Sequence, residues 1–182
     1  MNRCSWVNEK NPIYIKYHDE EWGEAHHDDA QLFELLILEI FQAGLSWETI
    51  LNKRANFQKS FSNFNPIEIA KYDDLKINEL MNNQGIIRNK RKITAVINNA
   101  KVFLKIKKEY KSFNNYIWHF TDKKVLYIDS LITKNELSNT ISKDLKKRGM
   151  KFIGTTIIYS YLQAIGIINS HDITCFKHKN LL

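Results

Sequence analysis

The stretch from Leu32 to Phe41 constrains the fold of this chain more than any other part of its sequence. It is almost entirely apolar, yet it contains two glutamates, Glu34 and Glu39. On a helix with about 3.6 residues per turn, Glu39 falls in the middle of the apolar face, whereas Glu34 lies near its edge. A carboxylate on a buried face is costly unless something pairs with it. The sequence therefore predicts a buried helix with an acid that needs a partner.

The residues after this helix predict a sharp turn into a second helix. Gly44 is suited to end the first helix, and Ser46 is suited to cap the next one. Trp47 then lies on the first turn of the second helix, close to the end of the helix that carries Glu39. An acid without a partner beside a tryptophan predicts a pocket for a cation. The alternative is that Glu39 pairs with a buried arginine or lysine, or with backbone N–H groups.

The rest of the chain indicates an all-α protein. Glycine (6) and proline (2) are scarce among the 182 residues, and apolar residues recur mainly with helical spacing. We expect residues 1–182 to form one domain, either undivided or made of two helical lobes, with a helical hairpin near 76–109. Only residues 125–129 have the composition of a strand. Helices are expected at residues 12–22, 29–43, 46–63, 66–72, 76–83, 89–109, 112–120, 136–148 and 155–165, with a short C-terminal helix that includes His171 and Cys175.

The chain is basic, with a formal net charge of +7 and a sequence pI of about 9.3. This charge fits either a polyanion partner such as nucleic acid or a merely basic protein of the cytoplasm. No segment has the uninterrupted apolar length of a membrane span, and the N-terminus has no apolar signal region. We therefore expect a cytoplasmic protein that does not associate with membranes.

Two cysteines and two histidines near the ends of the chain form a candidate metal site. Cys4 and His18 lie near one end, whereas His171 and Cys175 are four residues apart and share one face of the expected C-terminal helix. Two sulfur and two imidazole ligands suit a tetrahedral zinc ion, and four protein ligands leave no open position for a reacting water. In a reducing cytoplasm, metal binding or free thiols are favoured over a disulfide. The alternative is two buried thiols beside unrelated histidines. The other histidines have no matching spacing and are expected at the surface: His26, His27, His119 and His178.

The expected hairpin contains a candidate phosphate-binding turn. The sequence Gly85, Ile86, Ile87, Arg88 joins two helices, and a strongly basic helix start follows it. Backbone N–H groups at such a turn bind phosphate without regard to base sequence. Basic side chains would add Coulomb attraction; they are Arg88, Lys90, Arg91 and Lys92. The alternative is an ordinary helical hairpin with a solvated basic face.

Aromatic residues are concentrated in the first 47 positions. The set consists of Trp6, Tyr14, Tyr17, Trp22 and Trp47. A planar cation would stack on these rings and gain about 1–2 kcal/mol for each desolvated cation–π contact. It would also be the counter-ion that Glu39 lacks. The alternative is that the rings are ordinary core residues.

Several blocks of the sequence together resemble the DNA-3-methyladenine glycosylase I family. They are RCSWV at 3–7, YIKYHDEEWG at 14–23, LFELLILEIFQAGLSWETIL at 32–51, GIIRNKRKITAVINNA at 85–100 and LKKRGMKFIGTTIIYSYLQAIGIINSH at 145–171. The resemblance implies the all-α helix-hairpin-helix DNA glycosylase fold, with a structural zinc site at the four residues named above that joins the N- and C-terminal regions. It implies that Glu39, Tyr17, Trp47 and Trp6 line a base pocket with Tyr14 and Trp22 nearby. It also implies that the turn at 85–89 anchors DNA. Phe41 departs from the family pattern, where a smaller residue is expected, and this departure predicts a reshaped floor beneath Trp47.

The function implied by this resemblance is repair of alkylated double-stranded DNA by a monomeric enzyme. We expect it to flip out N3-methyladenine and hydrolyse its glycosidic bond, with no strand cleavage, while Glu39 recognises the cationic base or also speeds its departure. Leu45, at the tip of the turn, is expected to wedge into the gap that the flipped base leaves. Two other classes stay open on the residues alone. One is a non-catalytic, zinc-stapled helical module that binds nucleic acid, and the other is a zinc hydrolase with Glu39 as general base.

Overall fold

Most of the predicted helices form, and short polar side chains fix where they begin. The computed structural model describes residues 1–128 and 132–178 of the chain. Asp28, Ser46 and Asn89 each accept a hydrogen bond from a backbone N–H in the first turn of the following helix. The helices are α1 (Pro12–Glu20), α2 (Asp29–Gln42), α3 (Trp47–Ser60), α4 (Pro66–Ile69), α5 (Asp74–Asn82), α6 (Lys90–Tyr110), α7 (Phe113–Trp118), α8 (Glu136–Lys147) and α9 (Thr155–Ala164), with 3-10 turns at Ser62–Phe64 and His119–Thr121.

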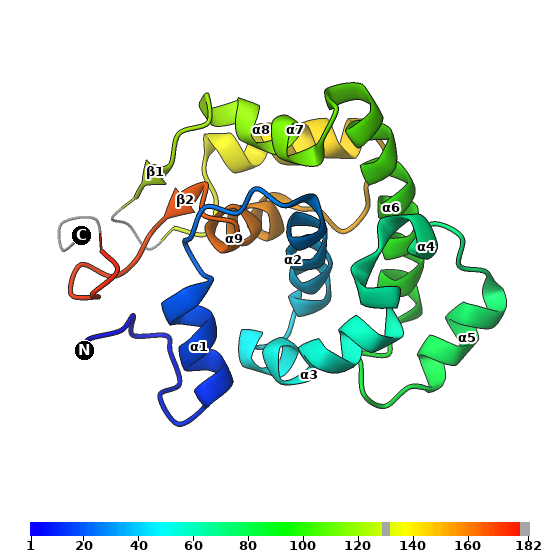
Figure 1. Cartoon of the computed structure of the whole chain (residues 1–182), viewed down its shortest axis with the longest axis horizontal. Helices are drawn as coiled ribbons and strands as arrows, with labels where there is room; N and C mark the ends of the chain where they lie inside the picture. Colours follow the sequence, from blue (N-terminus) through cyan, green and yellow to red (C-terminus); the bar gives the residue numbers. More distant parts are fainter. Residues whose placement is uncertain (129–131, 179–182) are drawn as a thin grey trace.

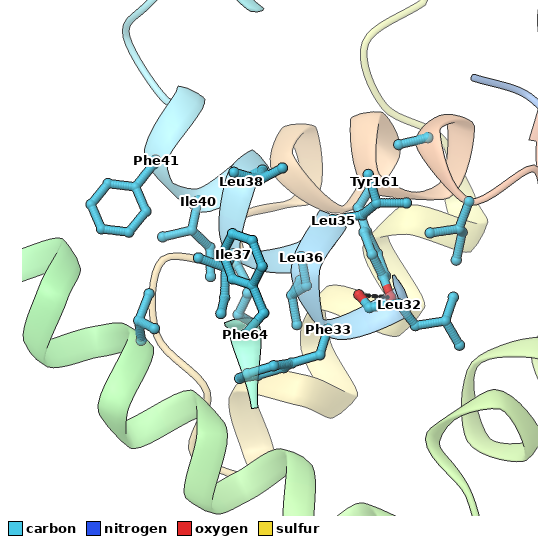
Figure 2. Close-up of a cluster of buried hydrophobic side chains, with 14 of the residues drawn as sticks. Leu32, Phe33, Leu35, Leu36, Ile37, Leu38, Ile40, Phe41, Phe64 and Tyr161 are labelled. Atoms are coloured by element: carbon cyan, nitrogen blue, oxygen red, sulfur yellow. Dashed lines mark hydrogen bonds between the residues drawn. The ribbon is translucent and has the colours of Figure 1, made fainter. Parts of the chain in front are cut away.

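Helix α2 lies at the centre of the fold, in contact with α3, α6, α7 and α9 (Figure 1). Every apolar side chain from Leu32 to Phe41 is fully buried (Figure 2). The Tyr161 hydroxyl of α9 donates to the Leu32 carbonyl at 3.0 Å, which fixes the start of α2. Phe41 packs against Phe57 and Phe61, so its bulk is absorbed in the core between α2 and α3. The prediction of a buried central helix is confirmed.

A buried lysine completes the end of α2. Lys92 lies on the first turn of α6 and is 6% exposed. Its Nζ donates to the carbonyls of Phe41 and Ala43 at 2.9 and 2.8 Å. These carbonyls belong to the last turn of α2, where no intrahelical donor remains. The start of α6 is therefore tied to the turn that carries Gly44 and Leu45.

A small parallel strand pair accompanies the helices. Strand β1 (Leu126–Tyr127) pairs with β2 (Ile168–Asn169), and the register places Leu126 opposite Ile168. The strand-like composition of residues 125–129 is thus partly confirmed, although Asp129 lies outside the described residues. The all-α prediction holds apart from this short pairing.

The C-terminal segment folds differently from the prediction. The expected short helix with His171 and Cys175 is wrong, because residues 171–178 form consecutive turns. The Cys175 N–H donates to the Asp172 carbonyl at 2.7 Å, and the Phe176 N–H donates across the molecule to the Asn2 carbonyl at 2.9 Å. Tertiary pairing with the N-terminal segment therefore replaces the helix, and the two segments lie side by side (Figure 1). Among the helices of the described residues, none combines the length and apolar character that crossing a membrane requires.

Candidate functional site

All five predicted aromatic residues and Glu39 line one pocket of about 260 Å³. The pocket lies where α1, α2, the start of α3, α9 and the C-terminal segment meet. The structure therefore brings these six residues together around one cavity. The lining residues are Trp6, Tyr14, Tyr17, Trp22, Glu39, Gln42, Trp47, Ile132, Ser160, Gln163, Ser170 and Asp172.

Helix α1 supplies two rings of the aromatic wall, Tyr14 and Tyr17. Tyr14 and Tyr17 are three residues apart, so they share one face of this helix. Trp6 packs against Tyr14 and Trp22, with ring centroids 5.4 and 4.8 Å apart. Tyr17 packs against Trp47 at 5.2 Å. The rings thus form two contacting groups on the pocket wall, and each offers a face on which a planar group can stack.

Tyr17 also contributes a polar group. Its side chain is 2% exposed, and burial together with the nearby Glu39 carboxylate raises the pKa of its hydroxyl well above the ordinary value. The hydroxyl therefore stays protonated at neutral pH and remains a hydrogen-bond donor.

Glu39 is buried at the pocket without a charged partner. It is 4% exposed, and burial raises the pKa of its carboxyl from 4.5 to about 8. Within residues 1–128 and 132–178, no hydrogen bond or ion pair reaches this carboxylate. Arg54 instead forms ion pairs with Glu21 and Glu34, each at 2.7 Å. The alternative in which Glu39 pairs with a buried basic side chain is therefore wrong for the described residues.

Trp47 is placed by the turn between α2 and α3. Gly44 has a φ of +85°, which favours glycine, and Ser46 Oγ accepts the Thr49 N–H at 3.2 Å. Trp47 is consequently the first residue of α3. Its Nε1 is buried and has no hydrogen-bond partner among the described residues. The pocket thus presents an unpaired acid beside aromatic rings, so its chemistry suits a planar, positively charged ring that carries hydrogen-bonding groups.

The turn between α5 and α6 is closely packed on α3. A Cβ on Gly85 would lie 3.0 Å from Asn83 Oδ1 and 3.1 Å from Asn56 Cγ, so a larger residue there would crowd both asparagine side chains. The Gly85 N–H itself donates to Asn83 Oδ1 at 2.8 Å. The N–H groups of Ile87 and Arg88 have no acceptor in the part of the chain that the structure describes.

The predicted DNA-contacting residues lie apart from the pocket lining. Arg88 and Lys90 are exposed at the start of α6, whereas Ile86 is 3% exposed and anchors the turn in the core. Leu45 is 38% exposed on the turn before α3. The buried Lys92 joins the start of α6 to the end of α2. The turn that carries Leu45 and the basic start of α6 are therefore held at a fixed distance from each other.

The four candidate metal ligands converge. The ligand atoms of Cys4, His18, His171 and Cys175 all lie within 4.8 Å of one another, and all four residues are buried. Cys4 Sγ lies 3.3 Å from His171 Nδ1, and Cys175 Sγ lies 3.4 Å from His18 Nε2. A tetrahedral zinc ion with Zn–S near 2.3 Å and Zn–N near 2.0 Å gives sulfur–nitrogen separations of roughly 3.5 Å. The donor set and its spacing therefore fit zinc.

The surroundings of this cluster also fit a metal. His18 Nδ1 is paired with Asp19 Oδ1 at 2.7 Å, and His171 Nε2 is paired with the Trp22 carbonyl at 3.2 Å. These contacts leave one nitrogen of each ring directed at the cluster, as the outer partners of metal-bound histidines do. Burial lowers the pKa of His171 to about 4, so its ring is neutral and able to act as a ligand. The surface position expected for His178 is wrong, because it is 2% exposed in the turn that carries Cys175.

Comparison with known proteins identifies the family. The family model described as methyladenine glycosylase matches residues 6–178. The chain belongs to the methyladenine glycosylase family. It is 41% identical over 180 residues to DNA-3-methyladenine glycosylase 1 of Escherichia coli (strain K12), covering 96% of each chain. A crystal structure of 3-methyladenine DNA glycosylase I is 43% identical, with a TM-score of 0.93, over 97% of this chain and 100% of the other. A variant of 3-methyladenine DNA glycosylase I in complex with 3-methyladenine is 34% identical, with a TM-score of 0.91, over 96% of both chains.

Sequence reasoning missed half of the wall of this glycosylase pocket. The missed residues are Gln42, Ile132, Ser160, Gln163, Ser170 and Asp172. Ser160 and Gln163 had a usable signal, because they are polar residues three apart on the otherwise apolar helix α9. Ser170 and Asp172 flank His171 and had no comparable signal.

The stability of this glycosylase is expected to fall as the pH rises from about 4.5 to about 8, because of Glu39. In that interval the unfolded chain releases the Glu39 proton while the folded protein keeps it. The folded state then binds more protons, so the free energy of unfolding falls by about 1.4 kcal/mol per pH unit. Glu39→Gln removes this dependence and should exceed the wild type in stability by up to about 3 kcal/mol at pH 7. Denaturant unfolding of both proteins between pH 5 and pH 8 tests this, and parallel pH curves would contradict it.

Proposed function

We propose that this protein excises N3-methyladenine from alkylated double-stranded DNA by hydrolysis of the N-glycosidic bond. The observation that carries the proposal is the buried Glu39, which has no cationic partner among the described residues and faces a pocket walled by aromatic rings. A base methylated at N3 is planar and cationic while it is attached to the sugar. It therefore supplies the positive charge that the carboxylate lacks and the flat surface that the rings accept.

Selectivity for the methylated base over normal adenine follows from the same pairing of Glu39 with a cationic base. Normal adenine is neutral, so it offers no charge that would stabilise the ionised form of the buried Glu39, whereas the cationic base does. A site built around a polar contact rejects ligands that lack the matching group far more strongly than an apolar pocket does. Tyr17 and Trp47 supply further donors and stacking surface, with Trp6 beside them and Tyr14 and Trp22 completing the wall.

The weakened bond of the methylated base supplies much of the reactivity. Because the leaving group is already positively charged, little acid catalysis is needed. Glu39 is proposed to recognise the cationic base and to hold it by hydrogen bonding. As the bond breaks, its electron pair goes to the base, which leaves as a neutral molecule, and the positive charge passes to the sugar, which water then attacks. The nucleotide reaches the pocket by flipping out of the duplex, which costs less for a damaged base.

The DNA-binding surface is proposed to run from the α5–α6 turn to the α2–α3 turn. The N–H groups of Ile87 and Arg88, with the side chains of Arg88 and Lys90, would hold phosphates. Gly85 and Ile86 shape this turn by close packing and burial. Leu45, exposed on the neighbouring turn, is proposed to fill the gap left by the flipped base.

We propose that the reaction leaves the DNA strand intact. Strand cleavage by glycosylases needs an amine nucleophile, and no lysine is among the described residues that line the pocket. The nearby buried Lys92 has its Nζ engaged by two carbonyls of α2.

Zinc is proposed to be held by Cys4, His18, His171 and Cys175, in a single domain of residues 1–182 that acts as a monomer. With four protein ligands the ion supplies no open coordination position, and its contribution is to link the two ends of the chain. This arrangement supports a structural role and argues against a zinc hydrolase with Glu39 as general base.

The test is release of the base from methylated duplex DNA. We expect free 3-methyladenine in the supernatant and alkali-labile abasic sites in DNA that stays unbroken before alkali treatment. Salt-dependent DNA binding without any released base would instead indicate a non-catalytic nucleic-acid-binding module. Strand breaks before alkali treatment would overturn the monofunctional reaction alone.

A further inference from the structure

Phe152 is an exposed aromatic residue in a left-handed backbone conformation. It has a φ of +54° and is 38% exposed. Residues other than glycine are disfavoured at such positive φ values. They keep this conformation only where the surrounding structure enforces it. Phe152 lies in the segment between α8 and α9 and does not line the pocket.

Two asparagines of α6 hold this segment in place. Asn99 is fully buried and exchanges two hydrogen bonds of 2.8 Å with the Lys151 backbone, one to its carbonyl and one from its N–H. Asn98 donates to the Gly149 carbonyl at 2.8 Å. The backbone from Gly149 to Lys151 is thereby fixed beside the middle of α6, directly before Phe152. A fully satisfied buried amide therefore positions an apolar ring at the surface.

The position of this ring is electropositive. The Arg91 guanidinium lies 5.9 Å from the Phe152 ring centroid, and Arg91 is exposed on the first turn of α6. Lys90 and Arg88 precede it on the same basic stretch. An aromatic face beside exposed cations is the combination that proteins use to stack unpaired nucleic-acid bases next to a phosphate backbone.

We propose that Phe152, supported by Arg91, stacks on a DNA base that loses its neighbour or its pairing partner when the damaged nucleotide is flipped. This inference rests on the proposed function, since it takes distorted duplex DNA as the ligand. It adds to the site a contact that recognises the distorted duplex, distinct from the pocket that recognises the excised base. The contact is made only when a base face is open, so it stabilises the flipped state in preference to the intact duplex.

The experiment compares Phe152→Leu with Phe152→Tyr on three probes. These are a duplex with a tetrahydrofuran abasic site, the matched undamaged duplex, and free 3-methyladenine. Because one base–aromatic stack is lost, Phe152→Leu is expected to bind the abasic duplex roughly ten-fold more weakly. It should bind the other two probes like the wild type, and Phe152→Tyr, which keeps the ring, should match the wild type on all three.

Salt dependence separates stacking from charge. Phe152→Leu should leave the slope of log affinity against log salt unchanged, whereas Arg91→Gln should reduce it by about one unit. Lys101→Gln, an exposed cation on the same helix, is the matched control and should leave abasic-duplex affinity unchanged within two-fold. Thermal unfolding confirms that each variant is folded.

The inference is overturned if Phe152→Leu binds the abasic duplex as the wild type does. It is also overturned if affinity falls equally for the undamaged duplex, or if free-base binding falls with it. Failure of the wild type to release 3-methyladenine would count against the proposed function and is measured separately from these affinities.

Discussion

Glu39→Gln is expected to lower single-turnover release of 3-methyladenine by roughly 100-fold or more, while binding of a duplex with an abasic site stays within two-fold of the wild type. Glutamine preserves the shape of the side chain but removes the negative charge that balances the cationic base. Glu39 is buried at the pocket and does not contact the α5–α6 turn, so the phosphate contacts should survive the substitution. Quantifying the released base and measuring duplex binding on the same preparation tests both the slower release and the unchanged DNA binding.

Glu34→Gln is the matched control on the same helix. Glu34 is ion-paired with Arg54 at 2.7 Å and does not line the pocket. Its substitution should therefore reduce stability without slowing base release in the folded protein. If both glutamine variants slow release equally, or if Glu39→Gln weakens duplex binding as much as release, Glu39 has a structural role and the proposed recognition fails.

Glu39→Gln is expected to raise the stability of the protein and to lower base release. Both effects arise from one physical cause. Burial without a partner raises the pKa of Glu39 to about 8, which destabilises the folded protein at neutral pH. A cationic base in the pocket would stabilise the ionised form of Glu39 and so offset the same cost of burial. A variant that is more stable and less active would therefore support the interpretation that the pocket is held ready for a positive ligand.

Local sequence rules predicted much of the fold because the relevant interactions are local. The apolar periodicity of α2 and the caps Asp28 and Ser46 depend on residues within one or two turns. The same periodicity predicted that Glu39 is buried, and the turn chemistry of Gly44 predicted that Trp47 lies beside it. The positions of Glu39 and Trp47 in the pocket could thus be predicted from one continuous stretch of sequence.

The remaining features depend on contacts between distant segments. The C-terminal helix does not form because the Phe176 N–H pairs with Asn2 instead of continuing a helical ladder. That pairing joins residues 174 positions apart, and no local pattern encodes it. Ser160 and Asp172 reach the pocket only because α9 packs on α2 and the C-terminal segment pairs with the N-terminal segment. Likewise, the occupied N–H of Gly85 could not be anticipated, since it depends on the orientation of the Asn83 side chain.

Removing the proposed zinc ion is expected to lower the thermal unfolding midpoint by more than roughly 10 °C, because the binding free energy of a structural zinc site rivals the whole stability of a domain. Burial raises the pKa of the Cys4 thiol, so a divalent cation is needed to hold the thiolate form in this interior. Without it, buried sulfur and nitrogen atoms about 3.3 Å apart lose the ion that joins them, and the paired N- and C-terminal segments should separate first. The purified protein should contain one zinc per chain by elemental analysis, and Cys175→Ser should reproduce the effect of a chelator.

The chelation result also discriminates between the roles of the metal. His27→Asn, at an exposed histidine outside the cluster, should retain full zinc content and the wild-type unfolding midpoint. If the metal is structural, base release should decline only in proportion to the fraction of protein that has unfolded. Loss of release in a protein whose unfolding midpoint is unchanged would instead show that the metal takes part in the reaction. That outcome would require an open coordination position, which the convergence of four buried ligand atoms within 4.8 Å argues against.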